Sequence, residues 1–125
     1  MVKAKSEIYK CEICGNMVEV VNVGGGTLVC CDQEMVCLKE NDTDAAVEKH
    51  VPVVEASDGK VVVTVGSVEH PMMDKHWIQF IEVVTPTQVL RADLEPGAKP
   101  IATFLTNEKV VKVREYCNLH GLWVK

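Results

Sequence analysis

Apolar and polar residues alternate along most of the chain after position 50, with a period of two that is typical of β-strands with one buried face. Valine is abundant, and β-branched side chains favour strands over helices. Asp58-Gly59 predicts a hairpin, while a helix is only weakly indicated, at 43–47. The pattern predicts strands at 51–56, 60–65, 76–84, 87–94, 101–106, 110–116 and 122–124. Short strands at this spacing predict a mainly β protein with a β-sandwich.

The first 38 residues show another pattern. Short apolar runs at 17–21 and 27–30 predict two small strands joined by a turn at Gly24-Gly25-Gly26. A chain of this length buries too little apolar surface to fold by itself. This part of the protein therefore needs a stabilising cross-link, for which a bound metal is the natural candidate.

Cysteines and histidines are unevenly distributed along the chain. Five of the six cysteines fall in residues 11–37, whereas the four histidines and Cys117 come later. A polar stretch at 39–46, rich in turn-forming residues, lies between the two groups. These observations predict a metal-stapled domain at 1–38 and a β-sandwich domain at 39–125.

Charge and composition narrow the classes of function. The net charge of −5 provides no basic excess for displacing counterions, which argues against a nucleic-acid partner. We expect no signal peptide and no membrane partner, since no apolar run approaches the roughly 18 residues that a membrane span needs. The protein is therefore expected in the cytoplasm, where clustered cysteines are more often metal ligands than disulfides.

Four cysteines form the first candidate metal site. Cys11-x2-Cys14 is followed by the adjacent pair Cys30-Cys31, and together they provide four thiolates for a tetrahedral ion. Four sulfur ligands select zinc or iron, and the spacing alone leaves both open. Adjacent cysteines are unusual in zinc ribbons and predict a distorted tetrahedron. Cys37 is left over, and we expect it to be a small buried hydrophobic residue.

The histidines and the late cysteine form the second candidate site. They fall at predicted strand ends or turns, where rigid scaffolds carry functional groups: His50, His70, His76, Cys117 and His120. The spacing Cys117-x2-His120 directs a thiolate and an imidazole toward one ion, and the amides of Leu119 and His120 can donate to the sulfur. Four imidazoles and one thiolate predict a square-pyramidal site with one open position, a geometry that iron accepts and zinc does not favour.

Glu48 and Lys49 stand directly before His50 in the segment EKHVP. By themselves, a glutamate and a lysine in a row are typical of a solvated loop. Beside a metal-binding histidine, they are candidates for controlling what binds to the metal. Side chains two residues apart on an extended backbone point to the same side, which would direct Glu48 toward a metal held by His50.

Parts of the sequence resemble known iron proteins. Residues 8–31, with YKCEICGNMVEVV and GGGTLVCC, resemble desulforedoxin, which holds one iron with four cysteines. The segments EKHVPV, VGSVEHPMMDKHWIQFIE and REYCNLHGLW resemble the signature segments of superoxide reductase. Nearly end to end and in order, the chain resembles the desulfoferrodoxin family, the two-iron form of that enzyme.

This resemblance implies an immunoglobulin-like β-sandwich and the one-electron reduction of superoxide to hydrogen peroxide, a detoxification without release of dioxygen. It implies iron at both sites, with Glu48 as the sixth ligand of the oxidised iron. Lys49 is implied to attract superoxide and to help supply protons, whereas Lys75, beside His76, is expected to be an ordinary surface lysine. The resemblance also implies a homodimer, a rubredoxin-like electron donor and an anaerobic source.

Other functions fit parts of the same sequence. An iron superoxide dismutase would release dioxygen, but such enzymes normally use histidines and a carboxylate rather than a thiolate. An iron electron-transfer or redox-sensing module would only store or pass electrons, whereas the open position favours an enzyme. A zinc-stapled binding module with surface histidines would be colourless.

Overall fold

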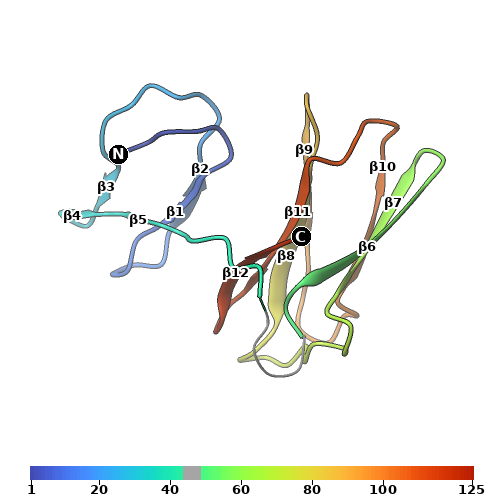
Figure 1. Cartoon of the computed structure of the whole chain (residues 1–125). Helices are drawn as coiled ribbons and strands as arrows, with labels where there is room; N and C mark the ends of the chain where they lie inside the picture. The colour runs from blue at the N-terminus through green and yellow to red at the C-terminus, as the bar shows by residue number, and fades with distance from the viewer. Residues whose placement is uncertain (44–48) are drawn as a thin grey trace. The chain divides into compact units, whose positions relative to one another are not determined.

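The structure, a computed structural model, describes residues 1–43 and 49–125. These residues form strands and loops, and no helix occurs among them, so the prediction of a mainly β protein is confirmed. Within the same residues, nothing has the length and apolar character of a membrane-crossing helix. The helical hint at 43–47 falls almost entirely outside the described residues. The chain divides into two compact units, Met1–Leu38 and Lys39–Lys125, each of which is described by itself (Figure 1).

The unit Met1–Leu38 is built from very short strands. Its three-stranded antiparallel sheet has the order β2-β1-β5, and a separate two-stranded ribbon joins β3 and β4. The bounds are β1 Ile8–Lys10, β2 Met17–Glu19, β3 Val29–Cys30, β4 Gln33–Glu34 and β5 Val36–Cys37. The runs predicted at 17–21 and 27–30 become β2 and β3, but these strands do not pair with each other across the glycine turn. Each pairs instead with a strand too short to show any alternation, β1 or β4.

Few side chains are buried in this unit. Its buried hydrophobic residues are Val2, Ile8, Tyr9 and Cys11, and Cys11 is itself one of the predicted metal ligands. So small a core supports the prediction that Met1–Leu38 depends on a bound metal for its fold.

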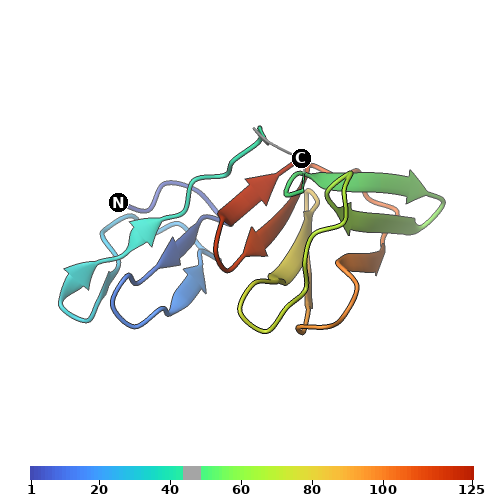
Figure 2. The same ribbon diagram turned by 90° about the horizontal axis from the view of Figure 1, so that it is seen from below.

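The unit Lys39–Lys125 is a sandwich of two antiparallel sheets. One sheet has the order β10-β7-β6 and the other β12-β11-β8-β9. Their bounds are β6 Pro52–Ser57, β7 Lys60–Val65, β8 Ile78–Val84, β9 Val89–Asp93, β10 Ile101–Leu105, β11 Lys112–Cys117 and β12 Gly121–Val124. Figure 2 shows β6 and β7 as the predicted hairpin, which turns at Asp58-Gly59. Three strands facing four in this order is an immunoglobulin-like arrangement, as expected.

Inward-facing residues of both sheets form the core of the sandwich. The core cluster consists of Val61, Val63, Val65, Ile78, Ile81, Val83, Ala102, Phe104, Val113 and Cys117. The last member matters for function, because Cys117 is a predicted metal ligand. Cys117, the last residue of β11, therefore belongs both to the packed core and to the predicted metal site.

A β-bulge interrupts the regular pairing of β8 with β11 beside this thiol. Tyr116 pairs with Phe80, but the next residue, Cys117, pairs with Ile78, so Gln79 is skipped. Sequence alternation places Gln79 on the face of Ile81, whereas in the structure it is Ile78 that lies fully buried in the core. The strand predicted at 76–84 accordingly begins only at Ile78. Bulges re-aim side chains, and this one lies directly at the predicted ligand.

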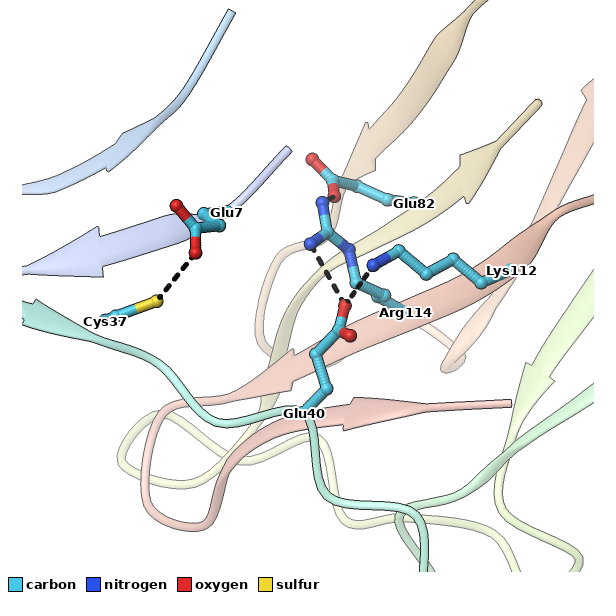
Figure 3. A network of polar contacts seen from close by, with 6 residues as sticks. All are labelled: Glu7, Cys37, Glu40, Glu82, Lys112 and Arg114. Carbon is cyan, nitrogen blue, oxygen red and sulfur yellow. Dashed lines mark hydrogen bonds and ion pairs between the residues drawn. The ribbon is translucent and has the colours of Figure 1, made fainter. Parts of the chain in front are cut away.

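An ion-pair network holds Glu40 near the start of this unit. Arg114 and Glu82 are 1% exposed and pair with each other on neighbouring strands. Glu40 accepts from Arg114 Nη1 at 3.2 Å and from Lys112 Nζ at 2.7 Å (Figure 3). Two residues of the sheet thereby fix the position of Glu40, just before the connection to the predicted site.

Candidate metal centres

The four predicted cysteine ligands come together in the unit Met1–Leu38. Their sulfur atoms all lie within 4.8 Å of one another, and Cys14 Sγ lies 3.6 Å from Cys30 Sγ. We call Cys11, Cys14, Cys30 and Cys31 the four-cysteine site. Such a group of converging soft ligands fits one zinc or iron ion.

A tight turn shapes the first half of this site. Gly15 N donates to Cys11 O at 2.9 Å, and Cys14 N lies 3.4 Å from Cys11 Sγ. Gly15 has φ +84°, a conformation that glycine adopts without strain. Hydrogen bonding from the Cys14 amide lowers the pKa of Cys11 to about 6, which favours the thiolate form that binds metal.

A left-handed hairpin turn shapes the second half. Cys31 and Asp32 connect β3 to β4 with φ values of +53° and +59°, as in a two-residue type I′ turn. This turn lets the adjacent Cys30 and Cys31 point to the same centre. The left-handed conformation costs a non-glycine residue about 1–2 kcal/mol. Neighbouring thiols raise the pKa of Cys31 to about 12, so the crowded sulfurs need a cation before all four can be thiolates.

The expectation for Cys37 is wrong. This cysteine is exposed rather than buried, and its Sγ lies 3.8 Å from Glu7 Oε2 (Figure 3). Its strand, β5, pairs with β1 at the sheet edge, and a two-residue edge strand has little cover to offer. Cys37 is not a member of the four-cysteine site.

The second predicted group also comes together, at one end of the sandwich. One ligand atom from each residue lies within 4.8 Å of those of all the others: His50, His70, His76, Cys117 and His120. We call these five residues the His/Cys site. The loops that bring them together precede β6, connect β7 to β8, and connect β11 to β12.

The four imidazoles form a closed cycle, which we call the histidine cluster. Neighbours in the order His50, His70, His76 and His120 have ring centroids 4.7–4.9 Å apart and interplanar angles of 67–81°. His50 Nε2 lies 3.1 Å from His120 Nδ1. This is the spacing of two neighbouring nitrogens that share one ion at bond lengths of about 2.1 Å.

Two buried nitrogens indicate what the histidine cluster is for. His70 Nδ1 lies 2.7 Å from Pro71 O, so this nitrogen carries the hydrogen and Nε2 has a free lone pair. Within the part of the chain that the structure describes, Nε2 of His70 and of His76 is buried without a hydrogen-bond partner. Burial lowers the pKa of His70 to about 4, so this histidine is neutral at neutral pH. Neutral imidazoles with buried, unshared lone pairs fit a metal ion.

Cys117 completes the His/Cys site with a thiol. Its Sγ lies 3.7 Å from His120 Nδ1. Burial raises the pKa of Cys117, and hydrogen bonds from the amides of Leu119 and His120 oppose this effect. The expected amide donors are therefore present. The thiolate is stabilised once a cation shares the site, since burial penalises an uncompensated charge.

Asn118 is a contributor that the sequence did not reveal. Its Oδ1 accepts from Trp77 N at 2.9 Å, and its Nδ2 donates to Lys75 O at 2.9 Å. One side chain thus connects the turn that carries Cys117 to both sides of His76. Its place between two ligands in Cys-x2-His was the available signal, but the partner segment lies about 40 residues away in sequence.

Asn118→Ala is expected to weaken metal binding at the His/Cys site about tenfold, because the two ligand loops lose their connection. The free energy of unfolding should fall by about 1–3 kcal/mol, the net contribution of two hydrogen bonds. Metal content after dialysis against a chelator measures the first effect. Asn107→Ala, at an exposed position on another turn, is the matched control. Equal metal retention in the two variants would contradict the connecting role.

The residues beside His50 are only partly described. Glu48 lies outside the described residues. Lys49 is half-buried, and its charge is one cause of the lowered pKa of His76, after burial and the neighbouring His120 and His50. Its positive charge therefore disfavours the protonated form of His76. Lys75 is exposed, as expected.

A small four-cysteine unit joined to a sandwich with a His/Cys site defines a metalloprotein with two different centres. The sequence of this chain matches two models of known protein families. The model described as Desulfoferrodoxin matches residues 42–125, and that of its N-terminal domain matches residues 3–38. The chain belongs to the desulfoferrodoxin family, which confirms the resemblance drawn from its sequence.

Individual relatives agree with this assignment. Desulfoferrodoxin from Syntrophotalea carbinolica is 56% identical over 119 residues, covering 95% of this chain and 94% of the relative. Desulforedoxin from Megalodesulfovibrio gigas is 56% identical over 32 residues, covering 26% of this chain and 86% of that protein. The crystal structure of the superoxide reductase from Treponema pallidum matches with a TM-score of 0.82 and 27% identity, covering 95% of this chain and 96% of that one.

Proposed function

We propose that this protein is a superoxide reductase with iron at both sites. The observation that carries the proposal is the histidine cluster joined by a buried thiol, with its ligand atoms within 4.8 Å of one another. Membership in the desulfoferrodoxin family and the similarity to the superoxide reductase from Treponema pallidum support it. The overall reaction takes one superoxide, one electron and two protons to one hydrogen peroxide.

Different residues have different roles in the proposed reaction. The histidine cluster and Cys117 would hold one iron, and the four-cysteine site would hold the second. Bound in the His/Cys site, iron would supply the electron for the reduction. Among the described residues, His120 is exposed and His50 half-buried, which supports access of a small anion to this side of the site. Solvent and Lys49 provide the protons that peroxide needs.

Lys49→Ala is expected to slow capture of superoxide about tenfold at low ionic strength, because a positive charge near the site attracts the anion. The remaining rate should depend less on salt, since screening acts on that attraction. Stopped-flow or pulse-radiolysis kinetics over a series of salt concentrations measure both effects. Lys75→Ala, the exposed lysine beside His76, is the matched control. Parental kinetics in Lys49→Ala would rule out the steering role.

Glu48 is proposed as the sixth ligand of the oxidised iron. The support is its place two residues before His50 and the family resemblance of the EKHVP segment. In this role its carboxylate would keep other anions from binding to the oxidised iron.

The stoichiometry of the reaction tests the proposed function directly. A reductase produces one hydrogen peroxide for each superoxide consumed, whereas a dismutase produces half as much together with dioxygen. The measurement requires a defined electron donor and an oxygen electrode. A yield of one half with dioxygen release would replace the proposal by dismutation, and absence of superoxide consumption would favour an electron-transfer or redox-sensing module.

We also propose that the protein is a cytoplasmic homodimer that receives electrons from a rubredoxin-like donor. The support for these points is the resemblance to the desulfoferrodoxin family. Light scattering of the purified protein tests the dimer, and anaerobic reduction of its oxidised iron by reduced rubredoxin tests the donor.

A further inference from the structure

Trp123 contacts two neighbouring members of the histidine cluster at once. Its indole ring stacks on the imidazole of His50, with centroids 4.8 Å apart and an interplanar angle of 17°. Its Nε1 donates to the backbone carbonyl of His120 at 3.1 Å. The two histidines are separated by 70 residues in sequence, yet a single side chain touches both.

Neither of these two histidines is fully buried, and His120 is the exposed member of the cluster. His70 is 1% exposed and has its own hydrogen bond to Pro71. His76 is flanked by backbone hydrogen bonds to Met73. His120 is exposed, and His50 is half-buried like His76, so conformational freedom must be removed to place the rings of His120 and His50.

The backbone of Trp123 is fixed from both sides. Glu115 pairs with it across β11 and β12, and a parallel bridge joins it to Asn41. The bridge includes Asn41 N to Leu122 O at 2.9 Å and Val124 N to Asn41 O at 2.8 Å. An indole held by such a frame provides a rigid surface for an imidazole to pack on.

We infer that Trp123 is a positioning residue that orients His50 and His120 for metal binding. The stack limits the rotation of the His50 ring, and the hydrogen bond from Nε1 fixes the turn that carries His120. A site that is ordered before the metal arrives loses less entropy on binding and holds the metal longer. This role depends on the proposed function in one respect only, which is that the His/Cys site holds a metal.

Two substitutions separate this role from general packing. Trp123→Leu removes both the stack and the donor, whereas Trp123→Phe keeps an aromatic ring over His50. The readout is the rate at which ferrous iron leaves the reduced full-length protein for an excess of a ferrous chelator, resolved into fast and slow phases. Iron in the four-cysteine site, followed by its own colour on reoxidation, is the internal control, and the melting temperature of each variant is measured in parallel.

Trp123→Leu is expected to release iron from the His/Cys site about tenfold faster than the parent, with unchanged release from the four-cysteine site. Trp123→Phe is expected to stay within about threefold of the parent, because the ring over His50 is kept. Parental release in Trp123→Leu would overturn the inference, and equally fast release in the two variants would overturn the role of the stack. Iron release is measured without superoxide, so the inference can hold even if the stoichiometry refutes the reductase.

Discussion

Gly66→Ala is expected to lower the free energy of unfolding of the sandwich by about 2–5 kcal/mol and to strip the His/Cys site of metal. Gly66 has φ +80°, where alanine is strained. A Cβ atom at this position would lie 2.5 Å from Lys49 O and 2.6 Å from Val68 O. Both contacts are with backbone, so no flexible side chain can move aside to relieve them.

The position of Gly66 explains why this change should affect the metal. Gly66 directly follows β7, and its amide donates to Val51 O at 3.2 Å. The backbone that would have to shift includes Lys49, next to the ligand His50, and Val68, two residues before the ligand His70. A displacement of either segment moves an imidazole away from the shared centre, and a metal site tolerates little misplacement.

Gly97→Ala provides the matched control for this prediction. Gly97 has φ +89°, but a Cβ atom there would meet nothing within 4 Å. The control should therefore lose only the cost of the strained conformation, about 1–2 kcal/mol, and retain its metal. Urea unfolding and metal analysis of the two variants measure the difference. If Gly66→Ala keeps its metal and is no less stable than Gly97→Ala, the close approach at Gly66 is not essential.

Loss of metal from the four-cysteine site is expected to unfold Met1–Leu38 and to leave Lys39–Lys125 folded. The first unit has only a few buried side chains, whereas the core cluster lies entirely within the second. Structural metal binding contributes on the order of 10 kcal/mol to small metal-dependent folds, more than a core of this size provides. We therefore propose that the second domain folds by itself and the first does not.

Cys14→Ser tests this prediction best, because Cys14 is exposed. Substitution of Cys11, which is buried, would also disturb the core. Amide NMR signals of residues 1–38 should collapse to the unfolded range in this variant, and those of the sandwich should persist. Cys37→Ser is the matched control, since Cys37 is an exposed cysteine of the same unit outside the four-cysteine site. Dispersed signals from residues 1–38 in the metal-free variant would show that the unit folds from its own core.

The sequence predicted the sandwich well because its strands are long enough to show a period. Strands of five or six residues, such as β7 and β10, alternate visibly between buried and more exposed positions. Strands of two or three residues, such as β1 and β4, contain no full period, and they were missed. The bulge opposite Cys117 was also missed, because a bulge is defined by the partner strand, which is not adjacent in sequence.

The chemistry of both sites follows from the residue types and their spacing. Residue types and spacing provided two separate ligand groups, the thiolates of Cys11-x2-Cys14 with Cys30-Cys31 and the imidazoles with Cys117, because ligand softness is a property of each side chain. How these ligands are held depends on contacts that form only in the folded protein. The stack of Trp123 on His50, the bonds from Asn118 to the backbone around His76 and the close approach at Gly66 join residues that are far apart in sequence or that share no local pattern. Such contacts depend on how sheets and loops pack, and the packing is fixed by the whole core rather than by any local stretch of the chain.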